Sequence, residues 1–116
     1  VRGYFEKAGY TNAIDFRVGN AIELIPEIDG PFDLVFIDAD KANYYNYFKL
    51  VFEKVRSGGF IIADNVLWSG KVVQTEKKID KDTQAILDFN RLTHEDDRVE
   101  NVLLPIRDGL MVLRKK

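Results

Sequence analysis

Two apolar runs that each end in an acid limit the folds open to this chain. Residues 32–37 run into Asp38, and residues 60–63 run into Asp64. The segment between the runs, residues 41–55, places aromatic and aliphatic side chains at helical spacing. A strand, a helix and a second strand in this order predict two parallel strands with a helix packed on them. Because parallel strands end at the same edge of a sheet, we expect both acids at the edge where such sheets bind ligands.

The rest of the chain extends this pattern. Gly9 predicts the end of an opening helix, and Asp108-Gly109 predicts a hairpin turn near the carboxyl terminus. Asp40 is expected to cap the central helix, and Ser57-Gly58-Gly59 is expected to end it. In chain order the expected elements are a helix at 1–9, a strand at 14–18, a helical turn at 21–25, a strand at 32–37, a helix at 41–55, a strand at 60–63, a loop at 66–80, a helix at 81–96 and strands at 99–106 and 110–114.

These elements predict an α/β fold with a mostly parallel sheet and an antiparallel carboxy-terminal hairpin. No repeat, low-complexity segment or linker divides the sequence, so residues 1–116 are expected to form a single domain. The loop at 66–80 is longer than most connections, and loops of that length often act as lids over a site.

Composition excludes several classes of function. The net charge is −2, with both signs interspersed, which offers no basic surface to nucleic acid or to an anionic membrane. The chain has no cysteine and one histidine, which excludes disulfides and argues against a histidine-rich zinc site. No apolar run reaches the length of a membrane span and no signal peptide is visible, so the expected location is cytoplasmic.

Three oxygen-bearing side chains follow the two strands. Asp38 comes after the first strand, and Asp64 and Asn65 come at the end of the second. Two carboxylates and an amide oxygen suit a hard divalent cation such as Mg²⁺. The alternative is that the two acids are only helix caps and loop residues.

Two further residues near these acids are candidates for chemistry. Lys41 stands at the start of the central helix, where a positive charge is disfavoured, and such a lysine can serve as a general base. The alternative is an ordinary surface lysine. Trp68, in the loop just past Asn65, is expected either to cover a ligand or to belong to the core.

At these residues the chain resembles the cation-dependent O-methyltransferases, the family of catechol and caffeoyl-CoA O-methyltransferases. The resemblance covers nearly the whole chain, and the pairing of FIDADK with ADNVLWSG is its most specific part. The similar stretches are FDLVFIDADKANY, GGFIIADNVLWSG, DFNRLTHEDDRVENVLLPIRDGL and, more weakly, EKAGY and FRVGNA.

The resemblance implies a Rossmann-like methyltransferase fold and a role for each candidate. S-adenosylmethionine would be the methyl donor, and Mg²⁺, Mn²⁺ or Ca²⁺ the cation. The implied roles are metal ligand for Asp38, Asp64 and Asn65, catalytic base for Lys41, cofactor contact for Asp40, the turn beside the adenine for Gly19, Asn20 and Ala21, and substrate contact for Trp68.

Two departures from the family pattern bear on the ligands. Family members often have aspartate where this chain has Asn20, which weakens that position as a cofactor contact. Plant caffeoyl-CoA enzymes place tyrosines where this chain has Ala85 and Ile86. The resemblance therefore implies a small catechol-like acceptor with two adjacent hydroxyl groups, rather than a bulky CoA ester.

The resemblance also implies that the chain is the carboxy-terminal portion of a methyltransferase domain. The glycine-rich cofactor loop, the acid that binds the ribose and the N-terminal helices of the family would all precede Val1. In the family's sheet order, two missing strands would lie between the strand at 14–18 and the strand at 32–37. Without these strands an apolar sheet edge is exposed. We therefore expect the chain alone to bind S-adenosylmethionine poorly and to associate, most simply as a homodimer, or to be a piece of a longer polypeptide.

Two alternatives from other classes stay open on sequence grounds. Receiver domains of signalling proteins also place an acid after a buried strand beside Mg²⁺, although they need an acidic pair after their first strand, where this chain has Gly19-Asn20. The other alternative is a non-catalytic fragment that serves in assembly.

Overall fold

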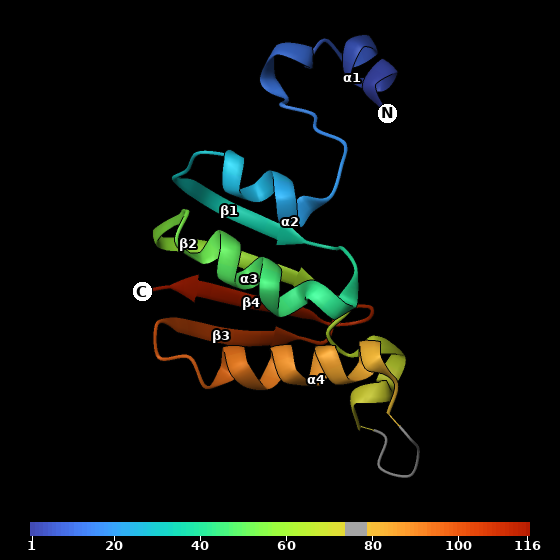
Figure 1. The fold of residues 1–116 in the computed structure, drawn as a ribbon, viewed down its shortest axis with the longest axis vertical. Coiled ribbons are helices and arrows are strands. Elements are labelled where there is room, and N and C mark those ends of the chain that lie inside the picture. Colours follow the sequence, from blue (N-terminus) through green and yellow to red (C-terminus); the bar gives the residue numbers. More distant parts are fainter. Residues whose placement is uncertain (74–78) are drawn as a thin grey trace.

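The structure is a computed structural model that describes residues 1–73 and 79–116. A four-stranded sheet forms its centre, with the strands in the order β1-β2-β4-β3 (Figure 1). β1 and β2 are parallel, whereas β4 is antiparallel to both of its neighbours. The strands are β1 (Phe32–Ile37), β2 (Val55–Asp64), β3 (Val99–Leu104) and β4 (Leu110–Lys115).

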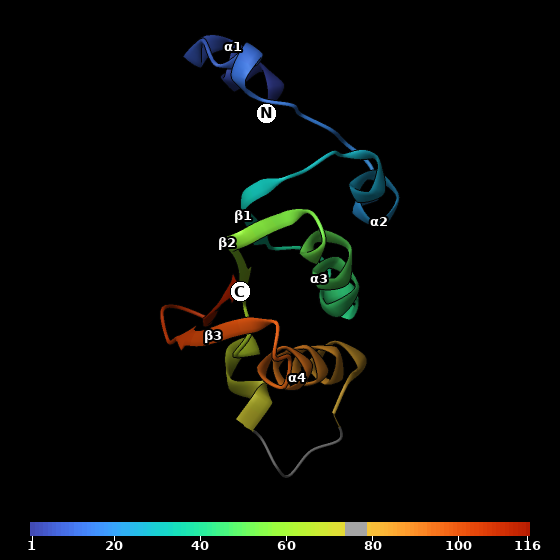
Figure 2. The same cartoon turned by 90° about the vertical axis from the view of Figure 1, so that its left-hand side faces the viewer.

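The helices that pack on the sheet lie on one of its faces. α2, α3 and α4 stand side by side along this face, which Figure 2 shows edge-on. Within the described ranges, no helix combines the length and apolarity needed to cross a membrane. The helices are α1 (Arg2–Ala8), α2 (Ala21–Leu24), α3 (Tyr44–Phe52) and α4 (Lys81–His94), and the short 3-10 turns are η1 (Thr11–Ala13), η2 (Ile25–Glu27), η3 (Lys41–Asn43) and η4 (Trp68–Val73).

The core fills the space between α3, α4 and the sheet. Aromatic side chains join the two helices, since Phe89 of α4 packs edge-on against Tyr44 and Phe48 of α3. All three side chains are fully buried, and such aromatic pairs add about 0.5–1.5 kcal/mol beyond the area that they bury. This packing fixes the start of α3 against the sheet, where the candidate residues gather.

The strand expected at 14–18 is absent. These residues have no sheet partner, and they form the extended connection between η1 and α2 that leads away from the sheet (Figure 1). The alternation of side chains was a correct sign of extended backbone, but a strand also needs a neighbour for its N–H and C=O groups. Parallel pairing in the described residues is therefore confined to β1 and β2, and the sheet is mixed.

The boundary between the central helix and the second strand also differs from expectation. The helix ends at Phe52, and the strand begins at Val55 and runs through the glycines that were expected to stop the helix. The pairing of β1 with β2 shifts at this point, and Gly58 has a φ of 81°. A Cβ on Gly59 would lie 2.7 Å from Val55 Cγ1 and 3.0 Å from the carbonyl oxygen of Asp33. The glycines thus allow a bulge within the strand rather than a break before it.

The sheet face opposite the helices is apolar and open. Phe36, Ile62, Val112 and Val102 lie in register across all four strands, and Phe36 and Val102 are more than half exposed. β1 is also an edge strand of the described sheet. The exposed apolar edge expected from the sequence is therefore present, while association with a second copy stays a prediction.

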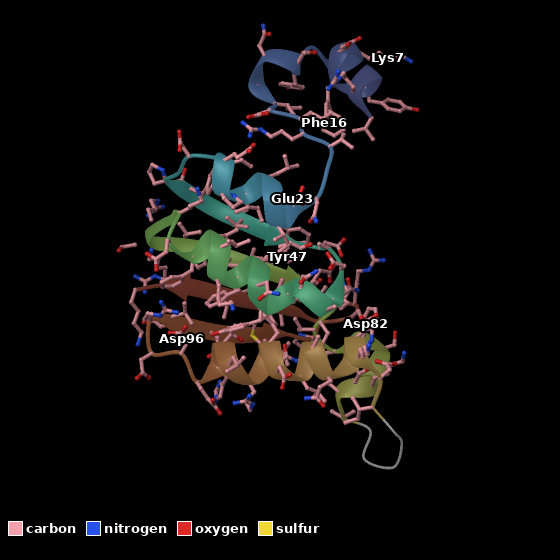
Figure 3. All side chains as sticks on the ribbon, in the orientation of Figure 1. Lys7, Phe16, Glu23, Tyr47, Asp82 and Asp96 are labelled. Carbon is pink, nitrogen blue, oxygen red and sulfur yellow. The ribbon has the colours of Figure 1, made fainter. Side chains whose placement is uncertain are left out.

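The helix and the two strands expected in the carboxy-terminal third are all present, and only their boundaries differ from expectation. The hairpin forms around Gly109, which has a φ of 86°, and α4 stops at His94, two residues early. The reason is Asp96, which lies at the turn between α4 and β3 (Figure 3). Its carboxylate accepts hydrogen bonds from the backbone N–H and the guanidinium of Arg98 and so closes the turn.

Hydrogen bonds from Arg98 hold the pKa of Asp96 below its usual value, so this turn predicts a pH-dependent stability. Asp96→Asn should lower the free energy of unfolding by about 1 kcal/mol at neutral pH. The ionised carboxylate stabilises the fold fully at pH values above its unfolded-state pKa of about 3.9. This stabilisation is lost as the pH falls through the lower pKa of the folded state, because the carboxylate is then protonated in both states. The difference from wild type, measured by urea unfolding, should therefore shrink below pH 4, while Asp97→Asn on the exposed neighbour should change little. A difference that stays constant down to pH 2 contradicts this role.

Candidate active site

The candidate residues gather at the carboxyl ends of β1 and β2. Asp38 follows β1, Asp64 is the last residue of β2, and the hairpin turn between β3 and β4 reaches the same edge because Asp64 pairs with Leu110. η3 and η4 begin directly after these strand ends. Side chains from the ends of β1 and β2, from the 3-10 turns that follow them and from the β3–β4 turn therefore lie at a single edge of the sheet.

Lys41 is at the centre of this cluster. Its side chain is only 9% exposed, and Nζ donates to the hydroxyl of Tyr44 at 2.6 Å. Nζ also lies 3.2 Å from Asn65 Oδ1 and 3.4 Å from Asp38 Oδ1. An ammonium group has three N–H donors, and each has an oxygen acceptor here. Lys41 is thus a buried, paired cation and not the surface lysine that the sequence left open.

Tyr44 joins Lys41 to the end of β2. Its hydroxyl accepts from Lys41 Nζ and donates to the backbone carbonyl of Asp64 at 2.7 Å. Burial, followed by the negative charges of Asp38 and Asp64, raises the pKa of Tyr44 far above neutrality. The hydroxyl therefore stays protonated and keeps both contacts at physiological pH. The sequence indicated Tyr44 only as one of the aromatic side chains at helical spacing in residues 41–55.

The turn after β2 has an unusual backbone. Asn65 has a φ of 63°, and Trp68 and Ser69 also lie in the left-handed region. Asparagine adopts this conformation more readily than most residues, whereas tryptophan rarely does. Left-handed residues concentrated in one segment are typical of functional sites, where the surrounding contacts hold them in place.

Asp108, in the hairpin turn, holds this backbone. Its Oδ2 accepts from Asn65 Nδ2 at 3.1 Å, and its Oδ1 accepts from the backbone N–H of Ser69 at 2.6 Å. Its own carbonyl accepts from the N–H of Leu67 at 2.9 Å. The sequence indicated Asp108 only as a turn residue, because the contacts depend on the register of the hairpin against β2.

Trp68 covers the cluster from η4. Its ring lies 5.6 Å from Lys41 Nζ, within the range of a cation–π contact, and the side chain is half-buried. The indole N–H is buried with no hydrogen-bond partner in the described residues. A buried, unpaired donor beside the acids suits contact with a bound molecule, which keeps the ligand role of Trp68 as a prediction. Residues 74–78 of the expected lid lie outside the described ranges.

The predicted metal ligands present suitable donors. In the described residues, no three His, Cys, Asp or Glu side chains come close enough to hold a metal ion, so the set depends on the amide of Asn65. Asp38 Oδ1 and Asn65 Oδ1 already face one shared positive charge, that of Lys41. Asp64 lies beside them, with its Oδ1 accepting from the N–H of Asn65 at 2.7 Å. Hard oxygens turned toward one cation are chemically suited to a divalent ion, and their role as ligands stays a prediction.

Asp40 lies apart from this cluster. Its carboxylate does not cap η3 as expected, because it accepts hydrogen bonds from the hydroxyl of Tyr47 and, at 2.5 Å, from Asn43 Nδ2. The bond from Tyr47 is the main reason that the pKa of Asp40 is lowered. Burial and the same bond raise the pKa of Tyr47 to about 12. Asp40 is thus an ionised carboxylate at neutral pH.

An apolar groove runs between α2 and β1 toward Asp38. Its volume is about 370 Å³, and its walls include Ala21, Ile37 and Tyr47. Asn20 caps α2 by accepting from the N–H of Ile22 at 3.1 Å, and Gly19 lines a second groove next to Ala21. The turn predicted to lie beside the adenine therefore borders apolar space that leads to the strand end.

Open α/β sheets bind their ligands outside the carboxyl ends of the strands, which is where this chain places an acid, an amide and an amine. A family model described as O-methyltransferase matches residues 1–116, and the chain belongs to this family. The match favours the methyltransferase hypothesis over the receiver-domain alternative.

Individual relatives agree with the family assignment. The chain is 38% identical over 120 residues to caffeoyl-CoA O-methyltransferase 1 of Eucalyptus globulus, covering 95% of this chain and 49% of that protein. It is similar in structure to the SAH-bound methyltransferase PaMTH1 of Podospora anserina, with a TM-score of 0.87, 29% identity and coverage of 99% and 54%. It is also similar to the O-methyltransferase of Bacillus cereus in complex with SAH, with a TM-score of 0.85, 30% identity and coverage of 98% and 56%. The chain spans about half the length of the relatives that it matches.

The two hydrogen bonds of the Tyr44 hydroxyl, to Lys41 Nζ and to the carbonyl of Asp64, can be tested by removing its oxygen atom. Tyr44→Phe leaves the ring in the core but takes a partner from Lys41 Nζ and from the carbonyl of Asp64. Since buried groups that lose a partner cost about 1–3 kcal/mol, the free energy of unfolding should fall by that amount in urea titrations. Tyr45→Phe, which removes the same atom from the next residue, is the matched control. Equal losses in the two variants would show that the Tyr44 hydroxyl has no special role.

Proposed function

We propose that this chain forms the metal-binding and base-bearing part of a divalent-cation-dependent O-methyltransferase that uses S-adenosylmethionine. The observation that carries the proposal is the convergence of Asp38 and Asn65 oxygens on the amine of Lys41, at the carboxyl end of two parallel strands. Membership of the family and the similarity to two SAH-bound methyltransferase structures support the choice of reaction and of methyl donor.

In the proposed reaction, a hydroxyl group of the acceptor loses its proton and its oxygen attacks the methyl carbon. A new O–CH₃ bond forms, the S–CH₃ bond breaks, and the sulfonium becomes a neutral thioether. A divalent cation on Asp38, Asp64 and Asn65 would lower the pKa of the bound hydroxyl.

Lys41 is the proposed acceptor of that proton. A neutral amine has two N–H donors and a lone pair, so the Lys41 ammonium would first have to release one proton to solvent, and with it one of its three contacts, before it can accept. The longest of these is the 3.4 Å contact to Asp38 Oδ1. The contacts to Tyr44 and Asn65 then hold Nζ in place while its lone pair faces the acceptor, which supplies the positioning that such transfers require.

The proposed cofactor end of the site is the groove beside Ala21. Its apolar walls suit an adenine ring, and Tyr47 in these walls donates a hydrogen bond to the ionised carboxylate of Asp40, which would contact a polar part of the cofactor. Because half of the relatives' length lies outside this chain, we propose that the chain alone binds S-adenosylmethionine weakly.

The proposed acceptor is a small aromatic molecule with two adjacent hydroxyl groups. Ile86 is fully buried in the core and Ala85 is small, so the start of α4 presents no large aromatic side chain to a long substrate at these positions. A free catechol should therefore be methylated with a kcat/KM at least about tenfold above that of a catechol-bearing CoA ester, as a lost hydrophobic contact changes specificity by this much. A preference for the CoA ester would overturn the acceptor assignment.

If Lys41 is the catalytic base, its removal should lower turnover without lowering the affinity for the metal. In the intact protein, Lys41→Ala should lower kcat for catechol methylation by about 10²–10⁴-fold, since that is the usual contribution of a general base. Mn²⁺ affinity, followed by electron paramagnetic resonance, should stay close to the wild-type value because Lys41 is not a proposed ligand.

Lys49→Ala on the exposed side of α3 is the matched control and should leave both quantities unchanged. If Lys41→Ala lowers Mn²⁺ affinity as much as turnover, Lys41 is a structural residue and the proposed mechanism fails.

A further inference from the structure

Asp108 contacts the proposed site without being one of its proposed ligands. It is half-buried in the turn between β3 and β4, 43 positions along the chain from Asn65 and 39 from Ser69. Gly109 allows this approach, because a Cβ there would lie 2.6 Å from Leu67 Cγ. The turn is therefore packed tightly against the segment that follows β2.

The carboxylate of Asp108 decides which way the Asn65 amide faces. An amide has a donor end and an acceptor end, whereas a carboxylate only accepts. Because Asp108 Oδ2 takes the Nδ2 end of Asn65, the Oδ1 end is turned toward Lys41 Nζ at 3.2 Å. With the amide reversed, two N–H donors would face the ammonium and a carbonyl would face the carboxylate, and both contacts would be repulsive.

The second oxygen of Asp108 is also engaged. Oδ1 accepts from the N–H of Ser69, next to Trp68 in η4. One carboxylate thus holds both the amide that faces Lys41 and the backbone that carries the tryptophan over it.

We propose that Asp108 is a positioning residue that orients the Asn65 amide, so that Oδ1 and not Nδ2 is presented to the cation site. This inference rests on the proposed function for its consequence, which is metal affinity, but the orientation itself is independent of any metal. Residues that orient metal ligands in this way typically change metal affinity by about 10–100-fold when replaced.

The decisive variant is Asp108→Asn, which keeps the shape of the side chain. The introduced amide has a single acceptor, so it cannot accept from both Ser69 and Asn65. If it keeps Ser69, its NH₂ group meets the NH₂ of Asn65, which must then reverse. We expect Mn²⁺ affinity in the intact protein to fall by at least about tenfold.

A double variant separates orientation from mere stability. In Asn65→Asp with Asp108→Asn, the introduced carboxylate accepts from the introduced amide with one oxygen and faces Lys41 with the other, and the total charge is that of wild type. We expect Mn²⁺ affinity to recover to within about threefold of wild type, a coupling typical of directly contacting residues. Asp97→Asn, an exposed exchange of the same kind, should leave the affinity unchanged.

A second measurement needs no metal. The side-chain amide signals of Asn65 in ¹⁵N NMR spectra can be assigned by their loss in Asn65→Asp. They should move strongly in Asp108→Asn and stay in place in Asp97→Asn. Unchanged Asn65 signals in Asp108→Asn, or a double variant no better than the single one, would overturn the inference. If wild-type protein binds no Mn²⁺, the cation part of the proposed function fails, while the amide signals still decide the role of Asp108.

Discussion

The buried ammonium of Lys41 and its three oxygen partners are the interaction on which the rest of the site depends. A charge at 9% exposure is costly unless it is paired, and the partners come from three places in the chain: the end of β1, the start of α3 and the turn after β2. Their oxygens are therefore directed at Lys41 Nζ, a position that a bound divalent cation would take over. The need to pair the buried Lys41 charge brings together the same oxygens that are proposed to bind a cation. The pairing of this charge therefore underlies both the stability of the cluster and its proposed chemistry.

This cluster is held from both sides of the sheet edge. On one side, the Tyr44 ring packs against Phe89 in the aromatic core, and its hydroxyl accepts a hydrogen bond from Lys41 and donates one to the carbonyl of Asp64. On the other, the β3–β4 hairpin brings Asp108 against Asn65. The parallel pair provides Asp38, Asp64 and Asn65, and the antiparallel hairpin holds the side-chain amide of Asn65. The mixed sheet thus has a functional consequence, because a hairpin can return a turn to the carboxyl end of β2 within a few residues.

Local sequence patterns were sufficient for features that depend on neighbouring residues. Asp38, Asp64 and Asn65 could be placed at one edge because each follows a short apolar strand, and the hairpin could be placed from Asp108-Gly109. Features set by distant contacts could not be predicted. The alternation at 14–18 does not reveal whether a partner strand is present. Ser57-Gly58-Gly59 predicts the end of a helix, because the bulge that it forms instead depends on the pairing of β1 with β2. The role of Asp108 likewise depends on tertiary register.

Asp38, Asp64 and Asn65 are proposed to form a divalent-cation site beside Lys41. The most direct measurement is the anomalous scattering of Mn²⁺ in crystals of the intact protein grown with the metal. We expect a strong anomalous peak in contact with side-chain oxygens of these three residues, with Lys41 Nζ drawn away from Asp38. An absent peak at saturating Mn²⁺, with Lys41 still on Asp38 Oδ1, would contradict the proposed site.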